Sequence, residues 1–411
     1  MNLPGINRPI RVLVVDDSSF MRIALTRIIQ SDPELEVVGC AQDGREALEM
    51  TEELHPDVIT MDVEMPRMNG LEALRRLMAS APRPVIMVSS ATQEGVQTTF
   101  DALDCGAFDY IPKNVGSRAM DVTHIRRDLV GKLKSAAENR GRIRCVRPPD
   151  EIVVRREIGN RREPSAPPAA ICIGCSTGGP RALQHILPAL PAHLPVGIVV
   201  VQHMPMGFTG PFASRLDSIS KVHVKEAEAD DWVDAGSVLI APAGWHVTLY
   251  QRTHSRYAVR LSRTPGDTLH TPSVDVLMLS AAEVLRSRSM GIVLTGMGSD
   301  GSAGMKAIHE AGGYTVAQDE QTSAVYGMPR ACVAAGAVKK LVPLADISDE
   351  IVAAATWKPL WMVFEGAGQV TECRLRVRFS EYLLDLLGKG IERKGFLKIV
   401  EVGVGKTLTD N

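Results

Sequence analysis

Apolar and polar positions alternate in regular blocks along the first 125 residues. Apolar runs of four or five residues are separated by longer amphipathic stretches, and these runs cover residues 11–15, 36–40, 58–61, 85–88 and 108–111. This alternation predicts an α/β domain with a doubly wound, flavodoxin-like sheet of five parallel strands and helices on both faces. In such a sheet, ligands bind beyond the C-terminal ends of the strands.

Polar side chains follow four of these predicted strands. Asp16 and Asp17 end the first strand, Asp62 the third, Ser89 the fourth and Lys113 the fifth. Three converging carboxylates repel one another unless a hard divalent cation lies between them, so the cluster predicts a site for Mg²⁺. A solvated acidic loop would explain the first two aspartates, but it would not explain a hydroxyl and a lysine at matching strand ends.

These strand-end residues resemble those of the receiver domain of two-component response regulators. The resemblance covers residues 1–125 and implies that Asp62 accepts a phosphoryl group. The implied ligands of Mg²⁺ are Asp16, Asp17, Asp62 and the backbone carbonyl of Glu64. The implied phosphate contacts are Ser89 and Lys113, and the implied switch aromatic, which changes rotamer together with Ser89, is Tyr110.

A second block of alternation, expected to be a separate domain, covers residues 169–355. Residues 169–174 run into Ser176 in a Gly-x-Ser-x-Gly pattern, which is typical of a nucleophile elbow. Glycines allow the sharp turn, and the helix that follows offers amide groups to a developing negative charge. Ser176 could instead cap the helix or bind phosphate, although no Gly-x-x-x-x-Gly-Lys pattern for nucleotides is present.

Two further apolar runs, residues 196–201 and 290–294, end in loops that carry His203 and Asp300. If these strands are neighbours of the first, the two residues meet Ser176 at one edge of a mostly parallel sheet. A serine nucleophile needs an imidazole to take its proton and a carboxylate to orient that imidazole. The competing histidines, which lie in polar or turn-rich segments, are His223, His246, His254 and His270. The competing aspartates, which lack a glycine-rich loop after a buried strand, are Asp275 and Asp319.

The order serine, histidine, aspartate differs from that of the α/β-hydrolases. The loops 174–179, 202–209 and 294–301 instead resemble the signature loops of the chemotaxis protein-glutamate methylesterases, with Cys175 where alanine is commoner. Together with the receiver, the resemblance spans roughly residues 10–345. It implies the triad Ser176, His203 and Asp300, and an oxyanion hole made by the backbone amides of Thr177 and Met297.

The implied function is a phosphorylation-activated serine hydrolase that removes methyl groups from glutamate esters of chemoreceptors, releases methanol, and also deamidates receptor glutamines. The esterase reaction would need no cofactor, a histidine kinase would supply the phosphate, and the monomer would work at membrane receptor arrays without inserting into the membrane. Two other outputs stay open, a catalytically idle binding domain and a DNA-binding domain. The latter needs a basic recognition helix, which the sequence after the linker does not contain.

Composition argues against a membrane-spanning segment and against a protein that coats nucleic acid. The net charge of −2 excludes a globally basic protein, and no apolar run reaches the length of a signal peptide or a membrane helix, which predicts a cytoplasmic location. Seven scattered cysteines favour reduced thiols. Cys172 and Cys175 form a CxxC, a possible zinc or redox motif, but no second pair follows.

Two segments lack the alternation. Residues 126–168 hold twelve Lys or Arg against six Asp or Glu and end in a proline-rich stretch, which predicts a helix-tailed, mobile linker. A basic helix there could also touch nucleic acid or a membrane. Residues 356–411 contain an alternating stretch at 370–379 and are interpreted as an adaptor module, a packed extension or an unstructured tail.

Overall fold

The computed structural model describes residues 8–90, 92–113, 119–140 and 167–356. The proline-rich part of the expected linker and the C-terminal extension lie outside these residues.

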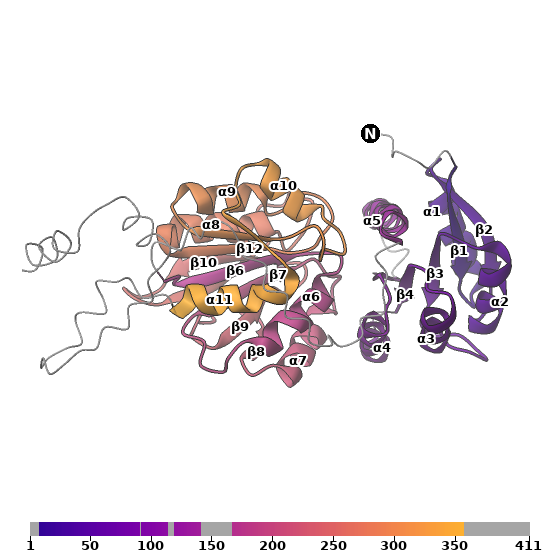
Figure 1. The fold of residues 1–411 in the computed structure, drawn as a ribbon, viewed down its shortest axis with the longest axis horizontal. Helices are drawn as coiled ribbons and strands as arrows, with labels where there is room; N and C mark the ends of the chain where they lie inside the picture. Colours follow the sequence, from indigo (N-terminus) through magenta and orange to yellow (C-terminus); the bar gives the residue numbers. More distant parts are fainter. Residues whose placement is uncertain (1–7, 91, 114–118, 141–166, 357–411) are drawn as a thin grey trace, which may run out of the picture. The chain divides into compact units, whose positions relative to one another are not determined.

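The first domain contains a five-stranded sheet with the order β2-β1-β3-β4-β5, and every neighbouring pair is parallel (Figure 1). Its strands are β1 (Ile10–Val15), β2 (Leu35–Ala41), β3 (Val58–Asp62), β4 (Val85–Ser89) and β5 (Asp109–Pro112). Its helices are α1 (Ser19–Gln30), α2 (Gly44–Leu54), α3 (Gly70–Ser80), α4 (Gln93–Asp104) and α5 (Ala119–Glu138). The predicted doubly wound fold is confirmed.

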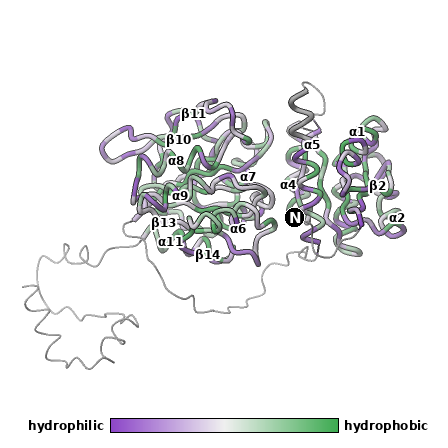
Figure 2. Tube along the Cα trace, turned by 90° about the horizontal axis from the view of Figure 1, so that it is seen from above, coloured by the Kyte–Doolittle hydropathy of each residue, from purple (hydrophilic) through white to green (hydrophobic). Residues whose placement is uncertain are grey.

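Successive side chains of β1 point to opposite faces of the sheet and pack in different hydrophobic cores. Leu13 and Val15 pack with residues of α2, α3 and α4, whereas Val12 and Val14 pack with residues of α1 and α5. The helices are amphipathic, and Figure 2 shows hydrophobic and hydrophilic residues following one another along them. Burial on both faces explains why the strands read as continuous apolar runs in the sequence.

Helix α5 extends past the expected domain boundary at residue 125. It continues to Glu138, and Leu129, Leu133 and Ala136 are fully buried in the same core as β1. The basic segment expected to begin a linker at residue 126 therefore starts as the last helix of the first domain.

The second domain is built on a larger sheet of seven strands in the order β14-β13-β12-β6-β7-β9-β8, all parallel. The strands are β6 (Ala170–Cys175), β7 (Gly197–Gln202), β8 (His223–Glu226), β9 (Ser237–Ile240), β12 (Ser289–Val293), β13 (Tyr314–Gln318) and β14 (Lys340–Val342). An antiparallel hairpin of β10 (His246–Gln251) and β11 (Tyr257–Ser262), which the sequence did not predict, packs against the helix α8 (Val274–Leu285).

Helices cover both faces of this sheet (Figure 1). One face packs against α6 (Gly179–Ile186), α7 (Thr209–Ile219) and α11 (Ile347–Thr356). The other packs against α8 (Val274–Leu285), α9 (Ser302–Glu310) and α10 (Met328–Ala334). No described helix of either domain has the length and apolar character needed to span a bilayer.

Strand β6 lies in the middle of the sheet, between β12 and β7. Its Gly174 pairs with Val293 on one side and Val201 on the other, so the three strands end at the same level. The neighbour relationship expected from the sequence is therefore observed, and the loops after these strands open onto one edge.

Candidate functional site

The first cluster of polar groups lies at the C-terminal edge of the five-stranded sheet. The carboxylates of Asp16, Asp17 and Asp62 offer ligand atoms within 4.8 Å of one another. Lys113 Nζ lies 2.5 Å from Oδ2 of Asp62 and 3.4 Å from Oδ2 of Asp16. The ends of β1, β3 and β5 thus bring together three carboxylates and a lysine that the sequence predicted to converge.

Burial changes the acidity of this cluster. Removal from water raises the pKa of Asp62 to about 6, and the nearby Asp16 adds to this effect while Lys113 opposes it. Burial also raises the pKa of Asp16, whose Oδ2 accepts no hydrogen bond from the described residues. A buried carboxylate oxygen of this kind beside two further carboxylates fits a hard divalent cation such as Mg²⁺.

The other predicted residues of this edge have defined partners. Ser89 is buried, donates a hydrogen bond of 3.0 Å to the carbonyl of Gly95 and accepts one of 2.7 Å from Thr99. The backbone amide of Glu64 lies 3.3 Å from Oδ1 of Asp62, and its carbonyl belongs to the same loop. Tyr110 is buried and stacks on Phe208, with ring centroids 4.8 Å apart.

Ser176 lies in a tight turn between β6 and α6. Gly178 has a φ of +79°, a conformation that favours glycine, and forms the N-cap of α6. The backbone of Ser176 is tied to the neighbouring loops, because its amide donates to Thr295 and its carbonyl accepts from the side chain of Gln202. A Cβ at Gly296 would lie 2.9 Å from that of Ser176, so the loop after β12 passes close behind the serine.

His203 and Asp300 are directly paired. Nε2 of His203 lies 2.8 Å from Oδ2 of Asp300. The carboxylate of Asp300 also accepts hydrogen bonds from the start of α8, namely from Ser273 Oγ (2.9 Å) and from the amides of Val274 (2.8 Å) and Asp275 (3.0 Å). The carboxylate of Asp300 therefore links the start of α8 to the imidazole of His203, whereas the N-cap of α9 is Gly301.

Asp300 is held in its charged form. Burial by itself would raise the pKa of this carboxyl, but the hydrogen bond and charge of His203, together with the backbone amides of Asp275 and Val274, bring it well below the usual value. Nδ1 of His203 is buried and makes no hydrogen bond with the described residues. Nδ1 is therefore available to accept a proton from another group.

A cavity of about 300 Å³ joins these side chains. Residues of the second domain that line it include Ser176, Thr177, His203, His270 and Met297, and residues of the first domain include Asp109, Tyr110 and Lys132. Among the described residues, Ser176 and His203 share this cavity without a hydrogen bond between their side chains. Such contacts often tighten only when substrate is bound.

The two residues expected to form an oxyanion hole flank the serine. Thr177 follows it directly, and its carbonyl accepts a hydrogen bond of 2.9 Å from Thr295 Oγ1, which fixes the loop before Met297. Met297 lines the same cavity, and its sulfur lies 3.6 Å from Ser135 Oγ of α5. Among the described residues, neither backbone amide has a hydrogen-bond partner.

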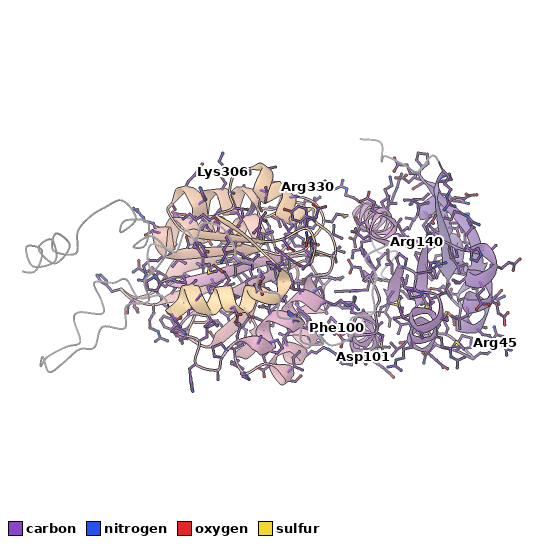
Figure 3. All side chains as sticks on the ribbon, viewed as in Figure 1. Arg45, Phe100, Asp101, Arg140, Lys306 and Arg330 are labelled. Carbon is purple, nitrogen blue, oxygen red and sulfur yellow. The ribbon has the colours of Figure 1, made fainter. Side chains whose placement is uncertain are left out.

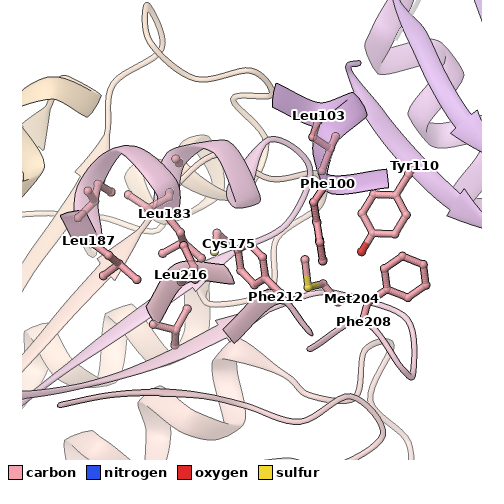
Figure 4. Packing of buried hydrophobic residues seen from close by; sticks show 14 of the residues in the cluster. Phe100, Leu103, Tyr110, Cys175, Leu183, Leu187, Met204, Phe208, Phe212 and Leu216 are labelled. Atoms are coloured by element: carbon pink, nitrogen blue, oxygen red, sulfur yellow. The ribbon is translucent and has the colours of Figure 1, made fainter. Parts of the chain in front are cut away.

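Residues of α4 and α7 belong to one buried apolar cluster, part of which is drawn in Figure 4. Phe100 of α4, labelled in Figure 3, packs on Phe212 at 5.4 Å between ring centroids. Arg215 of α7 lies 2.9 Å from the carboxylate of Asp101 and also pairs with Asp104. These contacts combine an apolar centre with a charged rim.

The CxxC pair does not form a site. Cys172 and Cys175 are three residues apart on one strand, so they point to opposite faces and belong to different cores. Both are free and fully buried, and burial raises the pKa of the Cys172 thiol to about 12. Such thiols are unreactive and cannot share a zinc ion.

Two residues of the site, His270 and Ser273, were not predicted from the sequence. His270 was set aside because it lies in a turn-rich segment. Its ring lies parallel to that of His203, with centroids 4.0 Å apart and 20° between the planes. Ser273, the N-cap of α8, was also missed, although a serine before an apolar helix is a recognisable cap signal. Both lie just ahead of α8.

The fold combines a receiver domain of the response-regulator type with a larger output domain, built on a parallel α/β sheet, that carries Ser176, His203 and Asp300 at one edge. The CheB methylesterase family model matches residues 171–351, and the response regulator receiver domain model matches residues 12–123. A protein-glutamate methylesterase/protein-glutamine glutaminase of Pyrococcus abyssi is 46% identical over 356 residues, which cover 86% of this chain and 95% of that protein. The chain therefore belongs to the CheB methylesterase family, in the form that carries a receiver domain.

A second relative agrees with this assignment. The protein-glutamate methylesterase/protein-glutamine glutaminase of Symbiobacterium thermophilum is 46% identical over 360 residues, covering 85% of this chain and 98% of its own. The solved structure of the Thermotoga maritima CheB methylesterase catalytic domain is 39% identical, with a TM-score of 0.44, and covers 45% of this chain and 97% of that domain.

Proposed function

We propose that Ser176, His203 and Asp300 act together as the catalytic triad of a glutamate methylesterase that works on chemoreceptors. The observation that carries this proposal is that His203, whose Nε2 lies 2.8 Å from the carboxylate of Asp300, lines the same cavity as Ser176. An imidazole fixed by a charged carboxylate, with its second nitrogen unpaired, is what a serine hydroxyl needs in order to lose its proton.

The reaction takes place in two halves. Ser176 Oγ attacks the ester carbonyl while Nδ1 of His203 takes the hydroxyl proton, and the same nitrogen then protonates the departing methoxide to give methanol. Water, activated by His203, cleaves the acyl-enzyme and frees the glutamate. The backbone amides of Thr177 and Met297 stabilise the oxyanion, and each such donor contributes about 10²- to 10³-fold in rate.

The receiver domain controls access to this chemistry. Asp62 accepts the phosphoryl group from a histidine kinase, and Lys113 and Ser89 contact the phosphate. Asp16, Asp17, Asp62 and the backbone carbonyl of Glu64 would hold Mg²⁺, which would supply positive charge next to the transferred group. Tyr110 is the switch aromatic, and the contact that this residue makes with Phe208 links the switch to the loop after His203.

In the unphosphorylated protein, residues of the receiver narrow the entrance to Ser176. Asp109 and Tyr110 line the cavity, and the side chain of Thr177 interacts with the carboxylate of Asp109. Phosphorylation biases this contact toward opening. The proposed enzyme is a cytoplasmic monomer that visits membrane receptor arrays, with a receiver from residue 1 to about 138, a catalytic domain over residues 169–355 and an extension of unassigned role.

Deamidation of receptor glutamine is the second activity proposed for the same triad, because an amide carbonyl offers the same electrophile and releases ammonia instead of methanol. The glutaminase half of the relatives' names favours it. Ammonia and methanol release from matched receptor fragments separate the two activities.

The decisive experiment measures methanol release from methylated receptor fragments by the full-length chain. Ser176→Ala should abolish release and labelling by a fluorophosphonate probe, whereas Ser218→Ala, on the surface of α7, should match the parent. Methanol release by Ser176→Ala at the parental rate would refute the nucleophile assignment. Labelling of Ser176 without methanol release would leave the triad in place and refute the substrate.

A further inference from the structure

His270 contributes a flat ring to the side of His203 that Asp300 does not hold. The two imidazoles lie parallel, with ring centroids 4.0 Å apart and 20° between their planes, and both line the cavity that contains Ser176. This contact covers a face of the His203 ring, whereas the hydrogen bond to Asp300 is made at its edge.

The segment that carries His270 is anchored by a second buried histidine. His246, at the start of β10, is fully buried. Its Nδ1 accepts a hydrogen bond of 3.2 Å from the amide of Ser273. Its Nε2 lies 3.0 Å from the carbonyl of Pro265 and 3.2 Å from Thr268 Oγ1. Hydrogen bonds to His246 therefore fix the chain on both sides of His270, at Pro265 and Thr268 before it and at Ser273 after it.

The same segment also holds the other partner of His203. Ser273 and the first amides of α8 donate to Asp300, three to five residues after His270. A single stretch of chain thus positions both partners of His203. These are the carboxylate of Asp300 at the edge of the imidazole and the ring of His270 on its face. The two contacts fix the imidazole in different directions.

One hydrogen bond leaves an imidazole free to tilt, because the χ2 torsion of histidine has a broad energy profile. A proton must arrive at Nδ1 from the serine and leave for methoxide, so tilting lengthens both transfers. We propose that His270 is a positioning residue that holds the plane of His203 by stacking. This role rests on the proposed triad, and it goes beyond that triad by assigning a fourth side chain to the site.

The flatness of the ring, and not its nitrogen atoms, carries this role, so the test compares His270→Leu with His270→Phe. We expect His270→Leu to lower kcat for methanol release about 10-fold with less than a twofold change in KM, since small misplacements of catalytic groups carry such costs. His270→Phe, which keeps a flat ring, should recover most of that loss. The labelling rate of Ser176 by a fluorophosphonate should follow the same order in the absence of receptor.

Asp267→Ala is the matched control, because Asp267 is exposed in the same loop and lies outside the cavity lining. Equal rates for His270→Leu and the parent would overturn the proposal. So would a His270→Phe variant as slow as His270→Leu, or a rise in KM at constant kcat. Probe labelling needs no receptor. If the proposed substrate were wrong, the variants would still show the expected order of labelling rates, and only methanol release would be absent.

Discussion

The ring of Tyr110, in β5, stacks on the ring of Phe208, just before α7, with 4.8 Å between centroids. Phe208 lies in the loop that begins with His203, and Tyr110 lies on the strand that leads to Lys113. Tyr110 is buried, which raises the pKa of its hydroxyl well above the usual value, and this hydroxyl has no hydrogen-bond partner among the described residues. The ring can therefore leave this position without breaking a hydrogen bond of its side chain.

Loss of Arg215 should raise the activity of the unphosphorylated enzyme. Arg215 pairs with Asp101 and Asp104 of α4 at the charged rim of the contact between the domains. Partly exposed pairs contribute up to about 1 kcal/mol each, so Arg215→Ala, which removes both pairs, should increase basal methanol release by up to about 30-fold. Initial rates without a phosphodonor measure this change.

A control for this variant is Arg256→Ala, which removes a surface pair with Asp234 inside the second domain. Its basal rate should equal that of the parent. Exchanging the charges, with Asp101→Arg combined with Arg215→Asp, should bring the basal rate back toward the parental value. An unchanged rate in Arg215→Ala would show that this rim does not hold the closed state.

Replacement of Asp62 should remove the response to phosphate while leaving the triad untouched. Asp62→Asn cannot accept a phosphoryl group, so a small-molecule phosphodonor that stimulates the parent should leave the variant at its basal rate. Chelation of Mg²⁺ by EDTA should have the same effect on the parent, because the carboxylates of Asp16 and Asp17 would then face the incoming phosphate without a cation. Stimulation of Asp62→Asn to the parental level would contradict the assignment.

Much of this architecture could be predicted because its strands are buried on both faces. The runs that became β1, β6, β7 and β12 are continuous in the sequence, and their polar residues follow at once. A helix was expected at the start of the linker, but its packing into the first domain was not, because its basic side chains masked a buried stripe of Leu129, Leu133 and Ala136. The spacing of that stripe, four and then three residues, is nevertheless helical.

The role of the segment before α8 could not be predicted from local patterns. Between β10 and α8 the chain is polar, because β10 and β11 form a half-exposed hairpin and the following loop is exposed. His270 reaches His203 only because His246, 24 residues earlier in the sequence, fixes the loop from within the domain. Such a contact depends on tertiary structure, and no spacing rule reports it.

The buried thiols should resist alkylation in the folded protein. Cys172 and Cys175 lie within the sheet, whereas Cys40 is exposed. We therefore expect iodoacetamide to modify Cys40 and to leave the other two unmodified until denaturant is added, as peptide mass mapping would show. Rapid modification of Cys172 in the native state, or zinc that copurifies in stoichiometric amount, would restore the CxxC as a functional motif.

Asp300 should contribute stability that depends on pH in a defined direction. Its pKa in the folded protein is lowered by His203 and by amides of α8, so the folded state favours the charged carboxylate. That contribution to the free energy of unfolding is fully present above about pH 4 and is lost as the pH falls further toward the folded-state pKa. Asp300→Asn lacks this titration.

The difference in free energy of unfolding between the parent and Asp300→Asn should therefore be largest near pH 7 and shrink below pH 4, and urea melts at several pH values measure it. Activity provides a second readout, since an asparagine at this position of a triad fails to fix the histidine tautomer and costs about 10⁴-fold in the serine protease example. A difference in stability that stays constant down to pH 2 would mean that Asp300 gains nothing from His203. In that case the hydrogen bond between them would be too weak to orient the imidazole for catalysis.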